Sequence, residues 1–199
     1  MNRFTKSAGM AAFIWRLTLT TGTGSIFGFL VARQGYDAAI MAPMFIIMSF
    51  SFGLAIFILV LMALYKWSNR PLGDAILFRL KNLLGVFVAA VMYFVLAYHI
   101  TNLYGTENHG VERFLLLDGG VYTQLFWIVQ IGLGSVLPLI LLYTPGPATS
   151  RPWIALSSVL VIIGGLAQMY VIIIGGQAFP MEMVPGKEVS SSFFDGVVG

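Results

Sequence analysis

Three polar residues close the third hydrophobic stretch of the chain and are its strongest candidates for chemistry. They are Tyr98, His99 and Asn102. On a helix Asn102 shares a face with both others, because residues three and four apart are neighbours. Histidine exchanges protons near neutral pH, and a tyrosine hydroxyl both donates and accepts hydrogen bonds. The cluster therefore predicts a site that binds a polar group or moves protons.

Polar side chains reach a comparable depth in three other hydrophobic stretches. They are Ser49 and Ser51, Gln130, and Gln168 with Tyr170. Such groups are costly in hydrocarbon and usually face the bundle interior or a cavity. Taken singly, the serines and glutamines fit hydrogen bonds between helices. Together with the first cluster they predict either a pocket for a quinone, which is lipid-soluble with polar ends, or a proton path.

The composition identifies the solvent around these residues. Hydrophobic residues make up 58% of the 199-residue chain and charged residues 10%, whereas a soluble domain has about 25% charged residues. We therefore expect an all-α, polytopic transmembrane helix bundle. The net charge of +3 is small, and no basic patch with interleaved aromatics predicts a nucleic-acid partner.

Five stretches are long and apolar enough to cross a bilayer core of about 30 Å. They cover residues 10–31, 41–65, 83–104, 122–143 and 154–176, with a loop at 105–121 and a tail at 177–199. No soluble domain fits between them, so residues 1–199 are expected to form a single transmembrane domain. Pro138 predicts a kink in the fourth span. Glycine-rich stretches at 21–28, 131–135 and 162–165 favour close helix packing.

Basic residues in short loops predict the orientation, because lysine and arginine concentrate on the cytoplasmic side. Seven lie on the side of the N-terminus: Arg3, Lys6, Lys66, Arg70, Arg79, Lys81 and Arg151. Three lie on the opposite side: Arg33, Arg113 and Lys187. We therefore expect the N-terminus in the cytoplasm and the loop at 105–121 and the tail outside. Arg16, in the first span, is expected to extend its side chain to the inner surface.

The loop at 105–121 is acidic. Glu107, Glu112 and Asp118 are its acidic residues, and Arg113 is its one basic residue. A solvated loop explains this pattern, and so does a docking surface for a soluble partner or a proton antenna above the polar cluster. As a functional interpretation, we expect the three carboxylates to form an acidic lip that faces a partner.

The histidine and cysteine counts limit the cofactors. The chain has no cysteine and two histidines, and His109 falls in the loop. Iron–sulfur clusters are held by thiolates, and a bis-histidine haem needs a second histidine inside a span. We expect neither a cofactor bound by this chain alone nor a histidine-based metal site. Any electrons would then reach the chain from a partner.

Three segments resemble the polysulfide reductase/NrfD family of membrane subunits. They are "GSIFGFLVARQGYDAAIMAPMFI" (24–46), "NLYGTENHGVERFLLLDGGVYTQLFW" (102–127) and "YVIIIGGQAFPMEMVPGKEVSSSFFDG" (170–196). Family members have about eight to ten helices in two bundles, carry no haem, and exchange electrons with the quinone pool through an iron–sulfur subunit. The resemblance implies that this chain is a fragment holding the later helices. The earlier bundle, which builds most of the quinone pocket in relatives, is then missing, so its ligands cannot be transferred.

The resemblance implies a non-haem membrane subunit of a respiratory oxidoreductase complex in a bacterial or archaeal cytoplasmic membrane. It would anchor an iron–sulfur ferredoxin-like subunit, alongside a molybdopterin enzyme or multihaem cytochrome c, and use menaquinone or ubiquinone as substrate. It would not be catalytic alone.

The sequence leaves two alternatives to the oxidoreductase-subunit interpretation. A solute or ion transporter fragment also carries polar groups at membrane depth, although the sequence places every acidic residue in a loop or tail. A purely structural anchor is the other. The first interpretation predicts that His99→Ala impairs quinone-linked turnover and leaves assembly intact.

Overall fold

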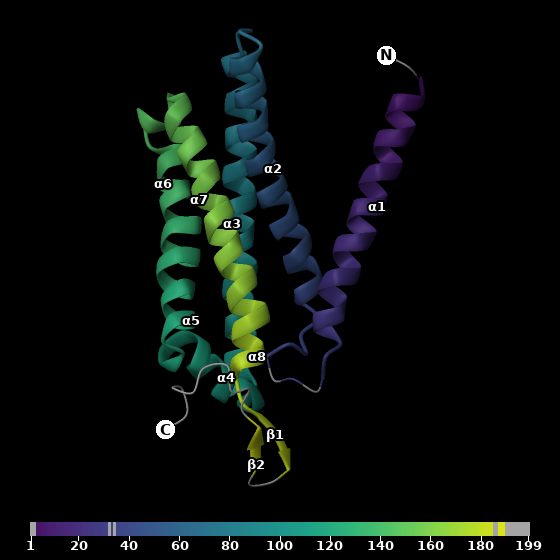
Figure 1. The fold of residues 1–199 in the computed structure, drawn as a ribbon, viewed down its shortest axis with the longest axis vertical. Coiled ribbons are helices and arrows are strands. Elements are labelled where there is room, and N and C mark those ends of the chain that lie inside the picture. The colour runs from purple at the N-terminus through teal and green to yellow at the C-terminus, as the bar shows by residue number, and fades with distance from the viewer. Residues whose placement is uncertain (1–2, 32, 34, 185–186, 190–199) are drawn as a thin grey trace.

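Five long helical segments form the body of the protein in the computed structural model (Figure 1). The structure describes residues 3–31, 33, 35–184 and 187–189, and side chains for all of these except residues 3 and 181–189. Helix α1 spans Arg3–Gly28, α2 Met41–Trp67 and α3 Asp74–Tyr104. The fourth segment joins α5 (Val121–Gln124), the π-helical η3 (Leu125–Val136) and α6 (Leu137–Tyr143). The fifth joins α7 (Arg151–Tyr170), the π-helical η5 (Val171–Gly175) and α8 (Gly176–Ala178).

Short elements connect the long helices at the two ends of the bundle. Between α3 and α5 lie η1 (Thr106–Asn108), α4 (His109–Arg113) and the π-helical η2 (Phe114–Asp118). They share one end, here called the loop end, with residues 29–31, 33 and 35–40 and an antiparallel hairpin of β1 (Met181–Val184) and β2 (Lys187–Val189) (Figure 1). The opposite end carries the N-terminus of α1 and the η4 turn (Pro147–Thr149).

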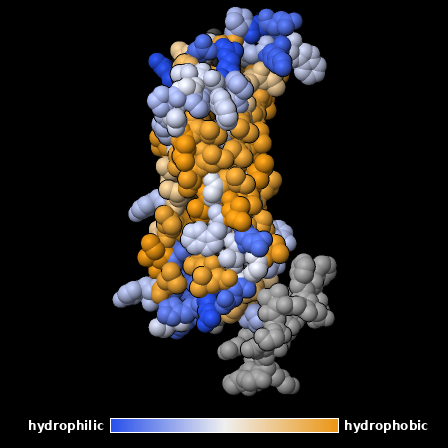
Figure 2. All heavy atoms as spheres, turned by 90° about the vertical axis from the view of Figure 1, so that its left-hand side faces the viewer, coloured by the Kyte–Doolittle hydropathy of each residue, from blue (hydrophilic) through white to orange (hydrophobic). Residues whose placement is uncertain are grey.

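Four of the five segments satisfy the length and hydropathy expected of membrane spans. They are Met41–Trp67, Asp74–Tyr104, Val121–Tyr143 and Arg151–Ala178. Figure 2 shows the matching surface, an apolar band between two polar ends. These findings confirm a polytopic helical bundle.

Helix α1 is the exception among the described segments, because it does not reach the hydropathy of a span. It lies against α2 at the loop end and diverges from it toward the other end (Figure 1). Arg16 is exposed midway along it. Four threonine hydroxyls donate to carbonyls one turn earlier on the same helix, those of Thr18, Thr20, Thr21 and Thr23. These bonds satisfy the threonine hydroxyls within the helix, which lowers the cost of placing them in lipid. A span at residues 10–31 stays a prediction.

Helix α3 begins nine residues before the expected span at residue 83. Arg79 and Lys81 are therefore helical and do not lie in a loop. Hydropathy marks only the part of a helix that lies in hydrocarbon, and the first turns of α3 are polar. Lys81 is 9% exposed, and its Nζ donates to the carbonyl of Ala148 across 3.3 Å.

Glycines let the helices approach closely, as their sequence pattern predicts. A Cβ placed on Gly134 would collide with the backbone of Gly164, so the fourth and fifth segments cross with backbone against backbone. A Cβ on Gly24 would lie 2.7 Å from the Cα of Ala42, so α1 packs closely against the start of α2 at this glycine. Pro138 lies in the first turn of α6. The irregular backbone of this segment lies just before it, as the wider π-helix η3, which ends at Val136.

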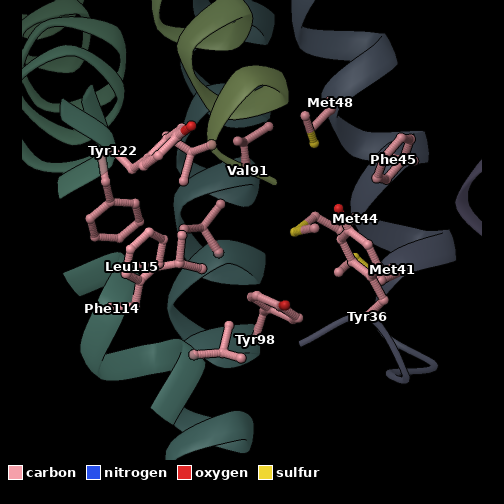
Figure 3. Packing of buried hydrophobic residues seen from close by; sticks show 14 residues of the cluster. Tyr36, Met41, Met44, Phe45, Met48, Val91, Tyr98, Phe114, Leu115 and Tyr122 are labelled. Atoms are coloured by element: carbon pink, nitrogen blue, oxygen red, sulfur yellow. The ribbon is translucent and has the colours of Figure 1, made fainter. Parts of the chain in front are cut away.

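The buried apolar residues form two clusters, one toward each end. The loop-end cluster comprises Tyr36, Met41, Met44, Phe45, Met48, Val91, Val95, Tyr98, Val111, Phe114, Leu115, Tyr122, Phe126 and Val171 (Figure 3). The opposite-end cluster comprises Ala55, Ile58, Leu72, Leu77, Leu84, Val88, Leu142, Ile154 and Val161. Most buried polar side chains lie beside the first cluster or between the two, and Lys81, Ser157 and Ser158 lie at the opposite end.

Candidate functional site

The polar residues that end α3 are buried together at the loop end. Tyr98, His99 and Asn102 keep only 4%, 9% and 3% of their surface exposed. The ring of His99 packs edge-on against Phe126, with 4.8 Å between ring centroids. His99 lies five residues before the end of α3, or about 8 Å along its axis. The structure therefore places this cluster inside the bundle and near its loop end.

Glu112 completes this cluster, although it lies in the connecting loop. It is fully buried on α4. Its Oε2 lies 2.7 Å from Nδ1 of His99, and its Oε1 accepts a hydrogen bond of 2.8 Å from Nδ2 of Asn102. Both carboxylate oxygens thus have a partner, which a buried carboxylate needs to offset its lost hydration.

The position of Glu112 differs from the expected acidic lip. The apolar Val111 and Leu115 are buried beside it, at 0% and 4% exposure. Burying these side chains folds the loop into the end of the bundle and takes the carboxylate of Glu112 with it. Glu112 is therefore not available to a docking surface. Glu112 lies in the connection between α3 and α5, as the sequence predicts for every acidic residue, but its side chain is buried.

The other two acidic residues remain at the surface. Glu107 and Asp118 are exposed, and Oδ2 of Asp118 accepts a hydrogen bond of 2.8 Å from Nε of Arg113. His109 is exposed as well, with Nε2 2.8 Å from the carbonyl oxygen of Leu103. The structure thus separates the expected docking residues from Glu112. A docking role for Glu107 and Asp118 stays a prediction.

The segment between α1 and α2 closes over the site. The hydroxyl of Tyr98 donates to the carbonyl of Gly35. The hydroxyl of Tyr36 lies 2.9 Å and 2.7 Å from the carbonyl oxygens of Ile172 and Ile173, in the π-helical η5. Arg33 Nη1 donates to the carbonyl of Gln177 across 2.6 Å. These bonds fasten Arg33, Gly35 and Tyr36 to the ends of α3 and of the fifth segment.

Sequence reasoning missed Tyr36 and assigned Glu112 to a docking surface, because both residues lie outside the hydrophobic stretches. One signal was present for Tyr36, which stands in the "ARQGYDAA" passage on which the family resemblance partly rests. Burial raises the pKa of Tyr36 to about 12, and the nearby charge of Arg33 acts in the opposite direction. The phenol is therefore a hydrogen-bond donor at physiological pH.

Tyr36→Phe is expected to lower the free energy of unfolding by about 1–2 kcal/mol, because the carbonyls of η5 lose their buried donor. The raised pKa gives this effect a pH dependence. The hydroxyl contributes fully below pH 10.0, its unshifted pKa, and the contribution disappears as the pH rises toward 12. Thermal unfolding of both proteins in detergent at pH 8 and above pH 10 measures it. An equal difference at both values would contradict this role.

Gln130 and Gln168 lie deeper than the cluster on α3. They are 4% and 2% exposed, and both line a cavity together with Tyr98 and His99. This cavity has about 10 Å³ of space for the centre of a water molecule. The structure therefore brings four of the five expected site residues to one cavity. The fifth, Asn102, does not line the cavity but donates a hydrogen bond to Glu112, which contacts His99 at the cavity wall.

The arrangement suits proton exchange better than ligand binding. Because Nδ1 of His99 is engaged by Glu112, Nε2 is the ring nitrogen left to exchange a proton with the cavity. Pockets for drug-sized ligands have about 300–1,000 Å³, far more than the space beside His99. Among the described residues, no group of three histidine, cysteine, aspartate or glutamate side chains is arranged to hold a metal ion.

Comparisons with known proteins add a family and two relatives. The family model described as "Polysulphide reductase, NrfD" matches residues 1–181. The "Hdr-like menaquinol oxidoreductase integral membrane subunit" of Archaeoglobus fulgidus is 28% identical over 186 residues, which cover 92% of this chain and 46% of the relative. A selenate reductase subunit of Mesobacillus selenatarsenatis is 24% identical over 179 residues, covering 90% of this chain and 41% of that relative.

The chain spans less than half the length of these curated relatives. No solved structure matches it. The family match nevertheless runs through all five helical segments and reaches residue 181.

Proposed function

The chain belongs to the polysulphide reductase NrfD family, and we propose that it works as a quinone-linked membrane subunit of a respiratory oxidoreductase complex. The names of its relatives, a menaquinol oxidoreductase subunit and a selenate reductase subunit, support this proposal. Four membrane-spanning helices and a buried titratable pair fit a subunit that handles protons while redox cofactors lie elsewhere. The proposal includes a bacterial or archaeal cytoplasmic membrane as its location.

The observation that carries the proposed role is the buried contact between His99 and Glu112. Oxidising a quinol releases two protons with its two electrons, and reducing a quinone takes up the same number. A histidine held by a carboxylate can accept such protons and pass them on. We assign this exchange to His99, with Glu112 holding the ring by Nδ1 and Asn102 fixing the carboxylate.

The cavity size favours one of the two roles that the sequence left open for this cluster. A space of about 10 Å³ admits water and not a quinone ring. Tyr98, His99, Gln130 and Gln168 are therefore proposed as a proton path. Menaquinone or ubiquinone would bind outside this cavity, at a surface of the assembled complex.

The loop end is the proposed contact surface for the redox partner. It gathers residues 29–31, 33 and 35–40, the exposed Glu107 and Asp118, and the β1–β2 hairpin. The excess of basic residues near the other end supports a cytoplasmic N-terminus, because lysine and arginine concentrate on that side of the membrane. An iron–sulfur ferredoxin-like subunit, with a molybdopterin enzyme or multihaem cytochrome c, would then dock on the outer side.

The buried Glu112 is a feature that a transporter could use, because an acidic side chain inside the protein can couple to an ion. Family membership argues against a transporter, since the relatives carry oxidoreductase names. The small cavity also offers no room for a solute larger than water.

Purification from the native membrane in mild detergent, with mass spectrometry of the associated proteins, tests the proposed assembly. We expect an iron–sulfur protein and quinol-dependent electron transfer in the purified complex. A chain that purifies without any redox protein, in preparations that retain other respiratory complexes, would contradict the proposal.

Glu112→Gln is expected to lower quinone-linked turnover about 10-fold. Glutamine can bond both partners only if its Oε1 accepts from Asn102 and its Nε2 donates to Nδ1 of His99, which reverses the bond that holds the histidine ring. Glu107→Gln is the matched control, since it removes an exposed acid from the same loop. Turnover of the purified complex with a quinol or quinone substrate measures both. Equal turnover in the two variants would remove Glu112 from the proton path.

A further inference from the structure

Among the described residues, two buried glutamines in the middle of the bundle each have one amide atom without a hydrogen-bond partner. Oε1 of Gln130 and Nε2 of Gln168 are both buried and unpaired. An unpaired polar atom in a protein interior costs about 1–3 kcal/mol. The first atom is an acceptor and the second is a donor. One water molecule could donate to the first and accept from the second, which would remove both penalties.

Space for water lies on both sides of these amides. The cavity shared with His99 reaches Gln130 and Gln168 from the loop end. A second cavity, also with about 10 Å³ for water centres, begins at the same two residues and extends to Ser51 and Ser135. A site of this size with several polar partners meets the requirements for buried water.

The second cavity ends against apolar side chains. Val88 and Val161 line it and belong to the opposite-end cluster. Beyond them Ile58, Leu84 and Leu142 are fully buried. Ser158 does not extend the polar line, because it lines neither cavity and its hydroxyl donates to the carbonyl of Ile154 on its own helix across 3.0 Å.

We propose that Gln130 and Gln168 hold a chain of buried water that joins the His99 site to Ser135 and stops at the opposite-end cluster. Gln168 lies ten residues from the end of α8, so the chain reaches about 15 Å from the end of the fifth helical segment. The inference rests on the proposed proton-exchange function and adds the end of the bundle at which protons are exchanged. Protons handled by this chain enter and leave at the loop end and do not cross the bundle.

The absence of cysteine from the sequence gives a direct test for water. Ser135→Cys and Ser158→Cys are near-isosteric changes at buried sites, with 5% and 0% exposure. Each variant carries a single thiol, whose S–H stretching band is lost when water exchanges the proton for deuterium. Infrared spectra of the full chain in a lipid bilayer, taken before and after transfer to D₂O, follow that loss against the cysteine-free parent.

The thiol at position 135 is expected to lose its S–H band in D₂O, and the thiol at position 158 to keep it. Adding Gln130→Leu and Gln168→Leu together should preserve the band at position 135, because both water-holding atoms are gone. A retained band at position 135 in the otherwise unchanged chain would overturn the water chain. Loss of the band at position 158 at the same rate would overturn its termination.

These outcomes are separate from the proposed function. Retention at position 135, with turnover still sensitive to substitution of His99, removes only the water chain. Exchange at position 135, with turnover insensitive to His99, leaves the hydrated path and removes its coupling to quinone chemistry.

Discussion

His99→Asn is expected to lower the quinone-linked turnover of the assembled complex by about 100-fold, the scale of a lost general acid–base group. The amide nitrogen of asparagine can take the place of Nδ1 and keep the bond to Glu112. It cannot take up a proton near neutral pH. The change therefore removes proton exchange while preserving the buried hydrogen bond, and turnover with a soluble quinol analogue measures it.

The two histidines of the chain form a matched pair for this experiment. His109→Asn changes an exposed ring that contacts the carbonyl of Leu103, so turnover should stay near that of the unchanged complex. Undiminished turnover in an assembled His99→Asn complex would show that His99 is structural.

His99→Ala is a less informative change than the sequence indicated. It would leave Glu112 without one partner, and breaking a buried pair from one side costs about 3–5 kcal/mol. The structure therefore revises the expectation that this variant assembles normally.

Gly164→Ala is expected to lower the free energy of unfolding by about 3 kcal/mol or more and to reduce the amount of folded subunit in the membrane. The new Cβ would overlap the backbone of Gly134, which cannot rotate away as a side chain can. The fourth and fifth helical segments would have to separate, and Gln130 and Gln168 lie on these same segments. Thermal unfolding in detergent and quantification of the membrane-inserted chain measure the effect.

Gly53→Ala provides the control for this substitution. Nothing lies within 4 Å of a Cβ at Gly53, and alanine favours a helix by about 1 kcal/mol over glycine. Its stability should equal or exceed that of the unchanged chain. If both variants were equally stable, the crossing at Gly134 and Gly164 would be looser than the structure shows.

Much of the fold follows from hydropathy because the lipid imposes the same requirement on every span. Backbone groups in hydrocarbon must be satisfied within the segment, so long apolar stretches form helices. The same argument placed Tyr98, His99, Gln130 and Gln168 inside the bundle. It marked only the part of α3 from residue 83 onward, although the helix begins at Asp74, because charged residues such as Lys81 lower the hydropathy of its first turns.

The rest of the site depends on contacts that no local pattern encodes. Glu112 belongs to a short polar helix, and only the burial of Val111 and Leu115 beside it brings its carboxylate to His99. Tyr36 acts on a backbone segment 136 residues away. Such pairings form when separate elements pack, so spacing along the chain does not reveal them.

The bonds that close the loop over the site have side chains on one side and main chain on the other. Tyr36 and Arg33 donate to the carbonyls of Ile172, Ile173 and Gln177, whatever side chains those residues carry. Mutational tolerance should therefore be unequal across each bond. Substitutions at the two donors break it, whereas the acceptor positions are free to drift in sequence as long as their helix keeps its path.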